Sequence, residues 1–190
     1  MKERYNIITK EILSSLAIAG IIMVASTSPY FLINIARAVI KNKKYNRNKN
    51  NEQRLVGSLR RLKNNHLVII KEKSDGKFVL ELTKEGKKKV EEIQFDNMKI
   101  KKPKVWDKKW RIVIFDIPEK QRKRARDALR EKLQKLGFYQ LQKSVWVCPY
   151  PCEKEINFLC EIFDINPFIG IIIAEKIYND IKLKRHFQLL

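Results

Sequence analysis

The part of the chain that most constrains its fold is residues 110–152, where a strand pattern, a helix pattern and a hairpin pattern follow one another. An apolar run ends at Asp116, and Pro118 with Glu119 opens a helix whose apolar residues recur every three to four positions. Gly137 ends this helix as a C-terminal cap would. The segment therefore begins with a strand-to-helix unit.

Two further strands, a second helix and a last strand follow this unit. Residues 138–141 and 145–147 are β-rich and flank a polar turn, which predicts a hairpin. Residues 153–163 have helical spacing, and the apolar run 168–174 predicts a buried strand. The order β-α-β-β-α-β is that of the ferredoxin-like fold, a four-stranded antiparallel sheet with both helices on one face. We expect an α+β protein, although this fold alone assigns no function.

Length and charge set the broad class of the protein. A chain of 190 residues has room for two small domains. It contains 41 Lys and Arg against 21 Asp and Glu, a formal net charge of +20. This excess exceeds what solubility requires and indicates a polyanionic partner, because clustered cations release counterions when they bind phosphates. Nucleic acid is the first candidate, and an anionic membrane surface is the second.

The three cysteines, Cys148, Cys152 and Cys160, indicate reduced thiols in a cytoplasmic protein rather than a disulfide framework. Cys148 and Cys152 are four positions apart, and the chain has only two histidines, His66 and His186, which disfavours a structural zinc site. We expect no cofactor.

Residues 12–36 carry no charged side chain, so a membrane span has to be considered. The strongly apolar part is short, and Ser28 with Pro29 is typical of a new helix start. We therefore predict two core helices, residues 12–25 and 29–40. The alternative is an N-terminal membrane anchor that leaves the rest of the chain in the cytoplasm, since basic residues follow the apolar stretch.

A third helix and a hairpin follow in the N-terminal half. Residues 41–51 are polar and basic and predict a loop, whereas residues 52–65 have an apolar and a basic helical face. Residues 67–71 and 77–82 alternate as strands around a turn that contains Gly76, and a further helix starts at Thr83. Three helices followed by a hairpin is the order of a winged helix-turn-helix.

Cationic and amide side chains on this third helix and hairpin are the candidate DNA contacts. Arginine and asparagine suit base edges, and lysines on a wing suit phosphates. Gly57 on the polar face either allows close backbone approach or only weakens the helix. The predicted nucleic-acid-binding residues are Arg54, Gly57, Arg60, Arg61, Asn64, Lys71, Lys73 and Lys77.

We predict three segments: a DNA-binding domain at residues 1–96, a basic linker at 97–109 and a ferredoxin-like domain at 110–190. The lysines of the linker make it a tether or a phosphate-binding arm. Trp106 and Trp110 are expected to pack this segment onto the second domain rather than to stack on bases.

The chain resembles the PaaX-type repressors of phenylacetate operons over nearly its whole length. In the second half the shared features are Pro118-Glu119 after the strand, Arg126-Asp127-x-Leu129-Arg130, Leu136-Gly137-Phe138 and Val145-Trp146-Val147-x-Pro149. In the first half they are Arg60-Arg61-Leu62 and Leu82-Thr83-x-x-Gly86.

Over about the last 80 residues the chain also resembles Cas-two (Cas2), the small ferredoxin-like CRISPR-associated protein. The shared features are Phe115-Asp116-Ile117, Leu136-Gly137-Phe138 and Gln142-Lys143-Ser144-Val145-Trp146. This resemblance implies a homodimer in which two copies of Asp116 hold a divalent metal for phosphodiester cleavage. The residues themselves favour another role for Asp116, as a carboxylate that caps the following helix.

From these features we expect a cytoplasmic, homodimeric transcriptional regulator that binds double-stranded DNA and dimerises through its C-terminal domain. The alternative is a Cas2-like, Mg²⁺-dependent endonuclease or a nucleic-acid scaffold of CRISPR adaptation, with Asp116 as catalytic and metal-binding residue. PaaX-type repressors bind an aryl-coenzyme-A effector, but no small-molecule effector is identifiable from this sequence. Residues 180–190 are expected to form a last strand or helix that pairs with a second protomer.

Overall fold

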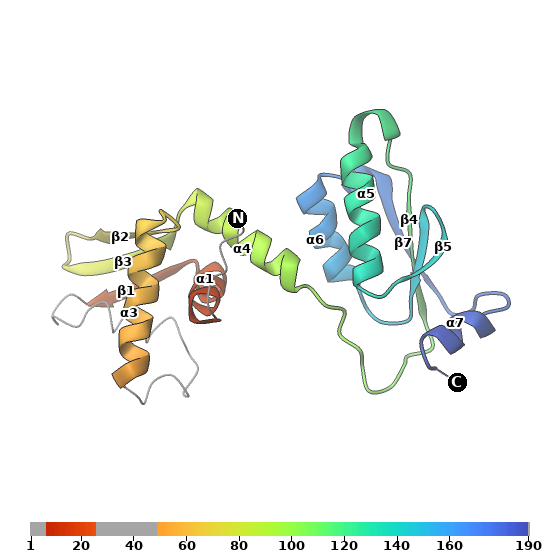
Figure 1. Ribbon diagram of the computed structural model, residues 1–190, viewed down its shortest axis with the longest axis horizontal. Coiled ribbons are helices and arrows are strands. Elements are labelled where there is room, and N and C mark those ends of the chain that lie inside the picture. The colour runs from red at the N-terminus through yellow and green to blue at the C-terminus, as the bar shows by residue number, and fades with distance from the viewer. Residues whose placement is uncertain (1–6, 26–48, 190) are drawn as a thin grey trace. The chain divides into compact units, whose positions relative to one another are not determined.

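A computed structural model of the protein describes residues 7–25 and 49–189 (Figure 1). The chain forms two compact units, Met1–Asp96 and Asn97–Leu190. Residues 97–109, expected as a linker, contain no helix or strand beyond the end of α4 and belong to the second unit. The mixture of helices and antiparallel sheets confirms the predicted α+β class.

The first unit combines helices with a small antiparallel sheet. Its described elements, in chain order, are α1 (Ile7–Ala19), β1 (Ile21–Ala25), α3 (Lys49–Asn64), β2 (Val68–Glu72), β3 (Lys77–Leu82) and α4 (Lys84–Asn97). The three strands form a sheet in the order β1-β3-β2. This order of elements is compatible with the expected winged helix-turn-helix, which stays a prediction.

Leucine and isoleucine side chains from every layer of the first unit build one core. Leu55, Leu59 and Leu62 of α3 are fully buried, as their spacing predicts. They pack with Ile12 and Leu16 of α1 and with residues of the hairpin and α4. This packing fixes which side of α3 faces away from the core.

The N-terminal unit departs from the sequence-based prediction in its first helix. The prediction of one helix over residues 12–25 is wrong, because the helix ends at Ala19 and Ile21–Ala25 forms strand β1, paired with Glu81 to Lys77 of β3. Gly20, with φ +70°, makes the turn between them. The predicted helix at residues 29–40 lies outside the described residues. The helix expected at 52–65 begins earlier, at Lys49.

Thr83 and Gly86 join the hairpin to α4 and to the end of α3. The Thr83 hydroxyl donates a hydrogen bond to the His66 carbonyl oxygen (2.6 Å) and accepts one from the Gly86 amide (2.9 Å), which is the geometry of a helix cap. A Cβ at Gly86 would lie 1.9 Å from the Leu67 carbonyl oxygen. Only glycine fits there, so the Leu82-Thr83-x-x-Gly86 motif has a structural cause.

The second unit has the predicted β-α-β-β-α-β order. Its elements are β4 (Trp110–Phe115), α5 (Glu119–Lys135), β5 (Tyr139–Gln142), β6 (Val145–Cys148), α6 (Glu153–Phe163), a short 3₁₀ turn (Asn166–Phe168), β7 (Ile169–Ala174) and α7 (Ile181–His186). The sheet is antiparallel with strand order β5-β6-β4-β7. This is the ferredoxin-like arrangement.

Helices α5 and α6 cover the same face of this sheet (Figure 1). Arg130 of α5 lies over the Phe115 ring, and Glu153 of α6 approaches Arg111 to 3.6 Å. Phe115 and Arg111 lie on one face of β4, because successive residues of a strand alternate. Gly137, with φ +84°, ends α5: its amide donates to the Gln134 carbonyl and the Phe138 amide to that of Leu133, so the predicted glycine cap is confirmed.

The prediction that residues 168–174 form a buried strand is wrong in its burial. Strand β7 lies at the edge of the sheet, and Ile172 and Ile173 are 48% and 53% exposed. An apolar run is buried on both sides when layers cover both faces of a sheet, and here helices cover only one, which leaves Ile172 exposed. Ile173 lies on the helix side, near the end of this edge strand.

The C-terminal tail covers one end of the other face. Leu183 of α7 is buried against Trp110 and Val147, together with Trp106 and Phe187. The expected last helix therefore packs on its own unit. Pairing of this segment with a second protomer stays a prediction.

In the part of the chain that the structure describes, none of the helices is both long and apolar enough to span a bilayer.

Candidate nucleic-acid interface

The face of α3 that points away from the core is basic and carries all the predicted residues of this helix. Arg54, Gly57, Arg60, Arg61 and Asn64 are all exposed. No acidic residue occurs from Gln53 to Asn64. From Gln53 to Asn64 the exposed face of α3 is therefore cationic or neutral, and it can place guanidinium and amide donors against base edges and phosphates.

Lys63 also belongs to this surface but was not among the predicted contacts. It is exposed and lies three positions after Arg60, so helical periodicity alone could have found it. Gly57 lies in the middle of the face, and a Cβ there would meet no atom within 4 Å. The protein's own packing therefore does not require glycine at this position.

The three predicted wing lysines lie on the β2-β3 hairpin and are exposed, but acidic neighbours offset two of them. Lys71 pairs with Glu81 at 3.0 Å and Lys77 with Asp75 at 2.8 Å. The ammonium of Lys77 donates a hydrogen bond to the Asp75 carboxylate and keeps the pKa of that carboxyl below its usual value. These ion pairs reduce the positive charge that the hairpin could offer to a phosphate.

Asp116 lies directly after β4, and its side chain is exposed. The preferred interpretation, that its carboxylate caps α5, is wrong: the N-cap residue is Pro118, and no side chain caps the helix. Among the described residues no hydrogen bond or ion pair of the Asp116 carboxylate is found. The backbone explains the difference, because Pro118 sets the start of the helix two residues after Asp116.

Asp116 has too few ligand partners for a metal site among the described residues of one chain. The described residues contain no group of three or more His, Cys, Asp and Glu side chains that could hold a metal ion. Mg²⁺ prefers several oxygen ligands in octahedral geometry, and a single carboxylate supplies too few. A second protomer would have to supply further ligands.

The three cysteines are free thiols and are all buried. The thiols of Cys148 and Cys152 share a hydrogen bond, which lowers the pKa of Cys148 and, with burial, raises that of Cys152. Burial also raises the pKa of Cys160. Thiols this shielded from solvent are unsuited to act as nucleophiles on a large substrate.

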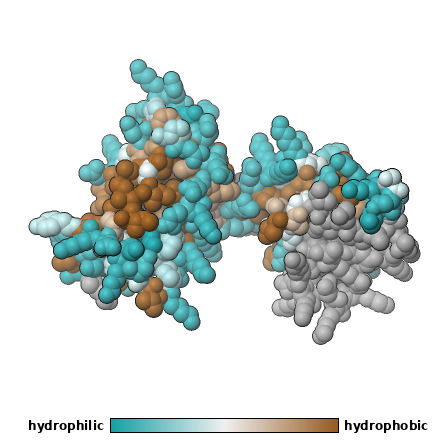
Figure 2. Space-filling model, turned by 180° about the vertical axis from the view of Figure 1, so that it is seen from behind, coloured by the Kyte–Doolittle hydropathy of each residue, from teal (hydrophilic) through white to brown (hydrophobic). Residues whose placement is uncertain are grey.

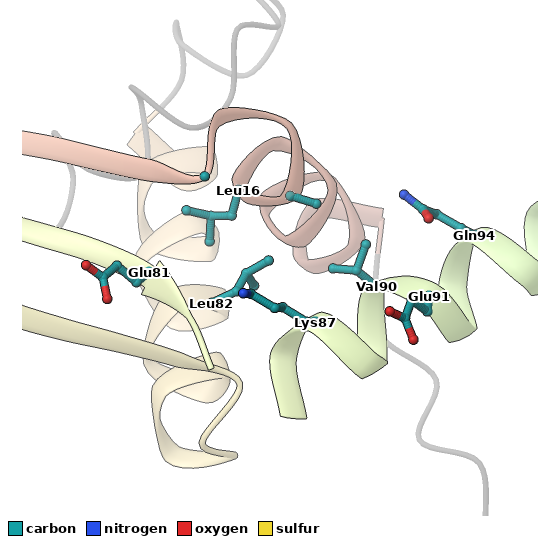
Figure 3. Close-up of a pocket in the computed structure, with 9 residues that line it drawn as sticks. Leu16, Glu81, Leu82, Lys87, Val90, Glu91 and Gln94 are labelled. Atoms are coloured by element: carbon teal, nitrogen blue, oxygen red, sulfur yellow. The ribbon is translucent and has the colours of Figure 1, made fainter. Parts of the chain in front are cut away.

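A cavity of about 530 Å³ opens in the first unit between α1, β3 and α4 (Figure 3). Its apolar part is formed by Leu16, Leu82 and Val90, and its polar side chains include Glu81, Lys87 and Glu91. The volume suits a small molecule. Because the charged side chains have opposite signs, the lining does not identify a class of ligand.

The second unit is similar to a known family of domains. Residues 103–185 match the family described as the PaaX protein central Cas2-like domain. This part of the chain is similar to that domain family. The predicted PaaX-type resemblance, with a Cas2-like domain, is thus confirmed. No curated protein shows significant similarity to the chain.

The PaaX Cas2-like domain begins before the ferredoxin-like fold does. The match starts at Pro103, in the basic segment, and ends at Arg185, in α7. It therefore includes Trp106, which packs on Trp110, and most of the helix that covers this tryptophan. Residues 103–109 of the basic segment and most of the C-terminal helix therefore lie within the matched region.

Proposed function

We propose that this protein is a PaaX-like transcriptional regulator that binds double-stranded DNA through α3 and dimerises through its Cas2-like domain. The exposed basic face of α3, which has no acidic residue from Gln53 to Asn64, is the observation that carries the proposal. The family match supports it, because the matched domain is named for its place in PaaX proteins.

The basic face of α3 has the physical properties of a recognition surface. The helix is held on its opposite side by three fully buried leucines, Leu55, Leu59 and Leu62. Its exposed arginines are therefore presented from a rigid element. Arginine pairs well with guanine and asparagine with adenine in the major groove, so Arg54, Arg60 and Asn64 suit base contacts.

The uncovered part of the C-terminal sheet supports dimerisation. Trp110, Ile112 and Ile114 lie on the face of β4 opposite the helices, and the tail covers only the Trp110 end. Away from that end Ile114 is 37% exposed, and Ile172 of β7, which pairs with Ile112, is 48% exposed. Figure 2 shows hydrophobic side chains gathered on this unit. Two copies of such a patch can bury each other around a twofold axis.

The experiment that tests the regulator function recovers the nucleic acid that the protein binds. The full chain is incubated with fragmented genomic duplex, and the retained fragments are sequenced. The proposal expects enrichment of a short sequence near promoters, with inverted half-sites if the protein is a dimer. Retention of fragments without sequence enrichment would contradict it.

One observation favours the second candidate, a metal-dependent nuclease: the Asp116 carboxylate is exposed and makes no ion pair in the described part of the chain. The same incubation with Mg²⁺ tests this function. Cleavage that Asp116→Asn abolishes would support the nuclease, and intact fragments would exclude it.

A further inference from the structure

The segment between the last turn of α4 and β4 carries many cations outside any helix or strand. We call residues 99–109 the basic strap. Its six lysines are Lys99, Lys101, Lys102, Lys104, Lys108 and Lys109, and all six are exposed. The second unit, residues 97–190, contains 21 Lys and Arg against 11 Asp and Glu, a net charge of +10. Half of the protein's positive charge is therefore outside the unit that contains α3.

Aromatic and ionic contacts hold the strap on the Cas2-like domain. The Trp106 ring packs edge-on against the fully buried Trp110 at 4.9 Å, and its Nε1 donates to the Lys109 carbonyl oxygen (3.0 Å). Asp107 accepts hydrogen bonds from both terminal nitrogens of the buried Arg111. A polyanion that binds the strap therefore meets a partly ordered segment, which lowers the entropy cost of binding.

The lysines of the strap are exposed to an external partner, although the Lys102 ammonium also lies over the Tyr150 ring, 5.9 Å from its centroid. The strap's single acid, Asp107, is bound by Arg111, and among the described residues no lysine of the strap forms an ion pair with a carboxylate. The hairpin differs, since Lys71 and Lys77 there each have an acidic partner. Cations without an internal counter-charge release the most counterions when a phosphate binds.

The spacing of the lysines suits the phosphates of a nucleic acid. Lys99 and Lys104 are five residues apart, so the chain between them spans at most roughly 17 Å. One strand of duplex DNA presents a phosphate about every 3.4 Å along the axis. Four lysines in this span can therefore each reach a different phosphate. Trp106 is turned into the domain, so the strap has no exposed aromatic anchor of the kind that membrane surfaces favour.

We propose that the basic strap is a second DNA-contact surface, which binds the phosphate backbone without reading sequence. This inference rests on the proposed DNA-binding function. In this proposal the strap sets the strength of DNA binding and its salt dependence, whereas α3 selects the DNA sequence.

Salt dependence of binding by the full chain tests the strap. Duplex affinity is measured by fluorescence anisotropy over a range of KCl concentrations for a variant with Lys99, Lys101, Lys102 and Lys104 all changed to Gln. The matched control changes four other exposed cations of the same unit, Lys154, Lys176, Lys182 and Arg185, to Gln. Both variants lose four charges, so general electrostatic attraction falls equally. Thermal unfolding checks that both remain folded.

The strap variant is expected to flatten the slope of log affinity against log salt by roughly 3 to 4, with little change in the control. Equal slopes for the two variants would overturn the proposal. Binding of the strap variant to vesicles of phosphatidylserine and phosphatidylcholine is measured as well. If this variant keeps the wild-type duplex slope but loses vesicle binding, the proposal is overturned and the strap is assigned to a membrane surface. An Arg54→Ala, Arg60→Ala variant measured in parallel shows separately whether α3 binds DNA.

Discussion

The carboxylate of Asp107 accepts a hydrogen bond from each terminal nitrogen of Arg111, at 2.8 and 2.6 Å. Arg111 is only 5% exposed and also donates to the Pro149 carbonyl oxygen. Asp107 thus neutralises a buried guanidinium and fixes the basic strap to the first strand of the ferredoxin-like sheet. A buried cation needs such a partner, because desolvation otherwise disfavours its charge.

Asp107→Asn is expected to lower the free energy of unfolding by about 1–2 kcal/mol, because charge-assisted hydrogen bonds are strong but Asp107 is itself 43% exposed. Chemical denaturation of the full chain measures this loss. The matched control is Asp116→Asn, which removes an exposed carboxylate without an ion pair in the described residues. Equal stabilities of the two variants would contradict the role given to Asp107.

The stability of the protein is expected to fall in acid, and Asp107 contributes to this fall. Hydrogen bonds from Arg111 hold the pKa of Asp107 below its usual value, and Arg126 does the same for Glu119. A lowered folded-state pKa stabilises the fold above the unfolded pKa of about 4, and this stability is lost as pH falls through the folded value. As the pH falls from 7 to 3, the midpoint of chemical denaturation should decline less in Asp107→Asn than in the wild type. Parallel declines would show that Asp107 does not contribute.

Gly86→Ala is expected to destabilise the first unit by about 3 kcal/mol, because the new Cβ would overlap the Leu67 carbonyl oxygen. Thermal unfolding followed by circular dichroism measures the loss. Gly57→Ala is the matched control: no atom lies within 4 Å of its Cβ, so it should stabilise α3 by roughly 0.5–1 kcal/mol.

The same Gly57 variant separates the two roles proposed for this glycine. If Gly57 allows the backbone to approach DNA, Gly57→Ala weakens duplex binding although the fold is more stable. Unchanged affinity would leave only the helix-weakening effect. A loss of stability in Gly57→Ala equal to that in Gly86→Ala would contradict the packing described for α3.

Much of the C-terminal domain could be predicted because its determinants are local. The cap at Gly137, the helix at residues 153–163 and the hairpin each depend on neighbouring residues. Strand β1 was missed because its partner, β3, lies more than 50 residues away and an apolar run fits either a helix or a strand. The turn at Gly20 and the β-branched residues Ile21 and Ile22 were the available signals.

The candidate site could be predicted for α3 but less well for the hairpin. Helical periodicity places Arg54 and Arg60 outside the apolar stripe of Leu55, Leu59 and Leu62, so their exposure follows from the pattern. The ion pair of Lys71 with Glu81 depends on the register of two strands, which the sequence does not specify. The cap proposed for Asp116 failed because a cap-like spacing does not fix where a helix begins after a proline.

Ile172→Glu is expected to convert the proposed dimer to a monomer without unfolding the protein. Glutamate on the uncovered face would place an unpaired charge in the dimer interface and raise the dissociation constant at least ~10-fold. Sedimentation equilibrium measures the change. Ile173→Glu is the matched control, because Ile173 is similarly exposed but lies on the other face of β7. Equal effects of the two substitutions would exclude the uncovered face as the interface.

The most direct test of the central claim, that α3 is the DNA-recognition surface, is the affinity of an Arg54→Ala, Arg60→Ala variant for the duplex recovered by sequencing. Each arginine that contacts a base is worth about 1–3 kcal/mol, so affinity should fall roughly 30-fold or more, with weaker discrimination against unrelated duplex. Lys182→Ala, Arg185→Ala removes two exposed cations from α7 and should bind as the wild type does. Unchanged affinity and unchanged sequence preference in the α3 variant would contradict the claim.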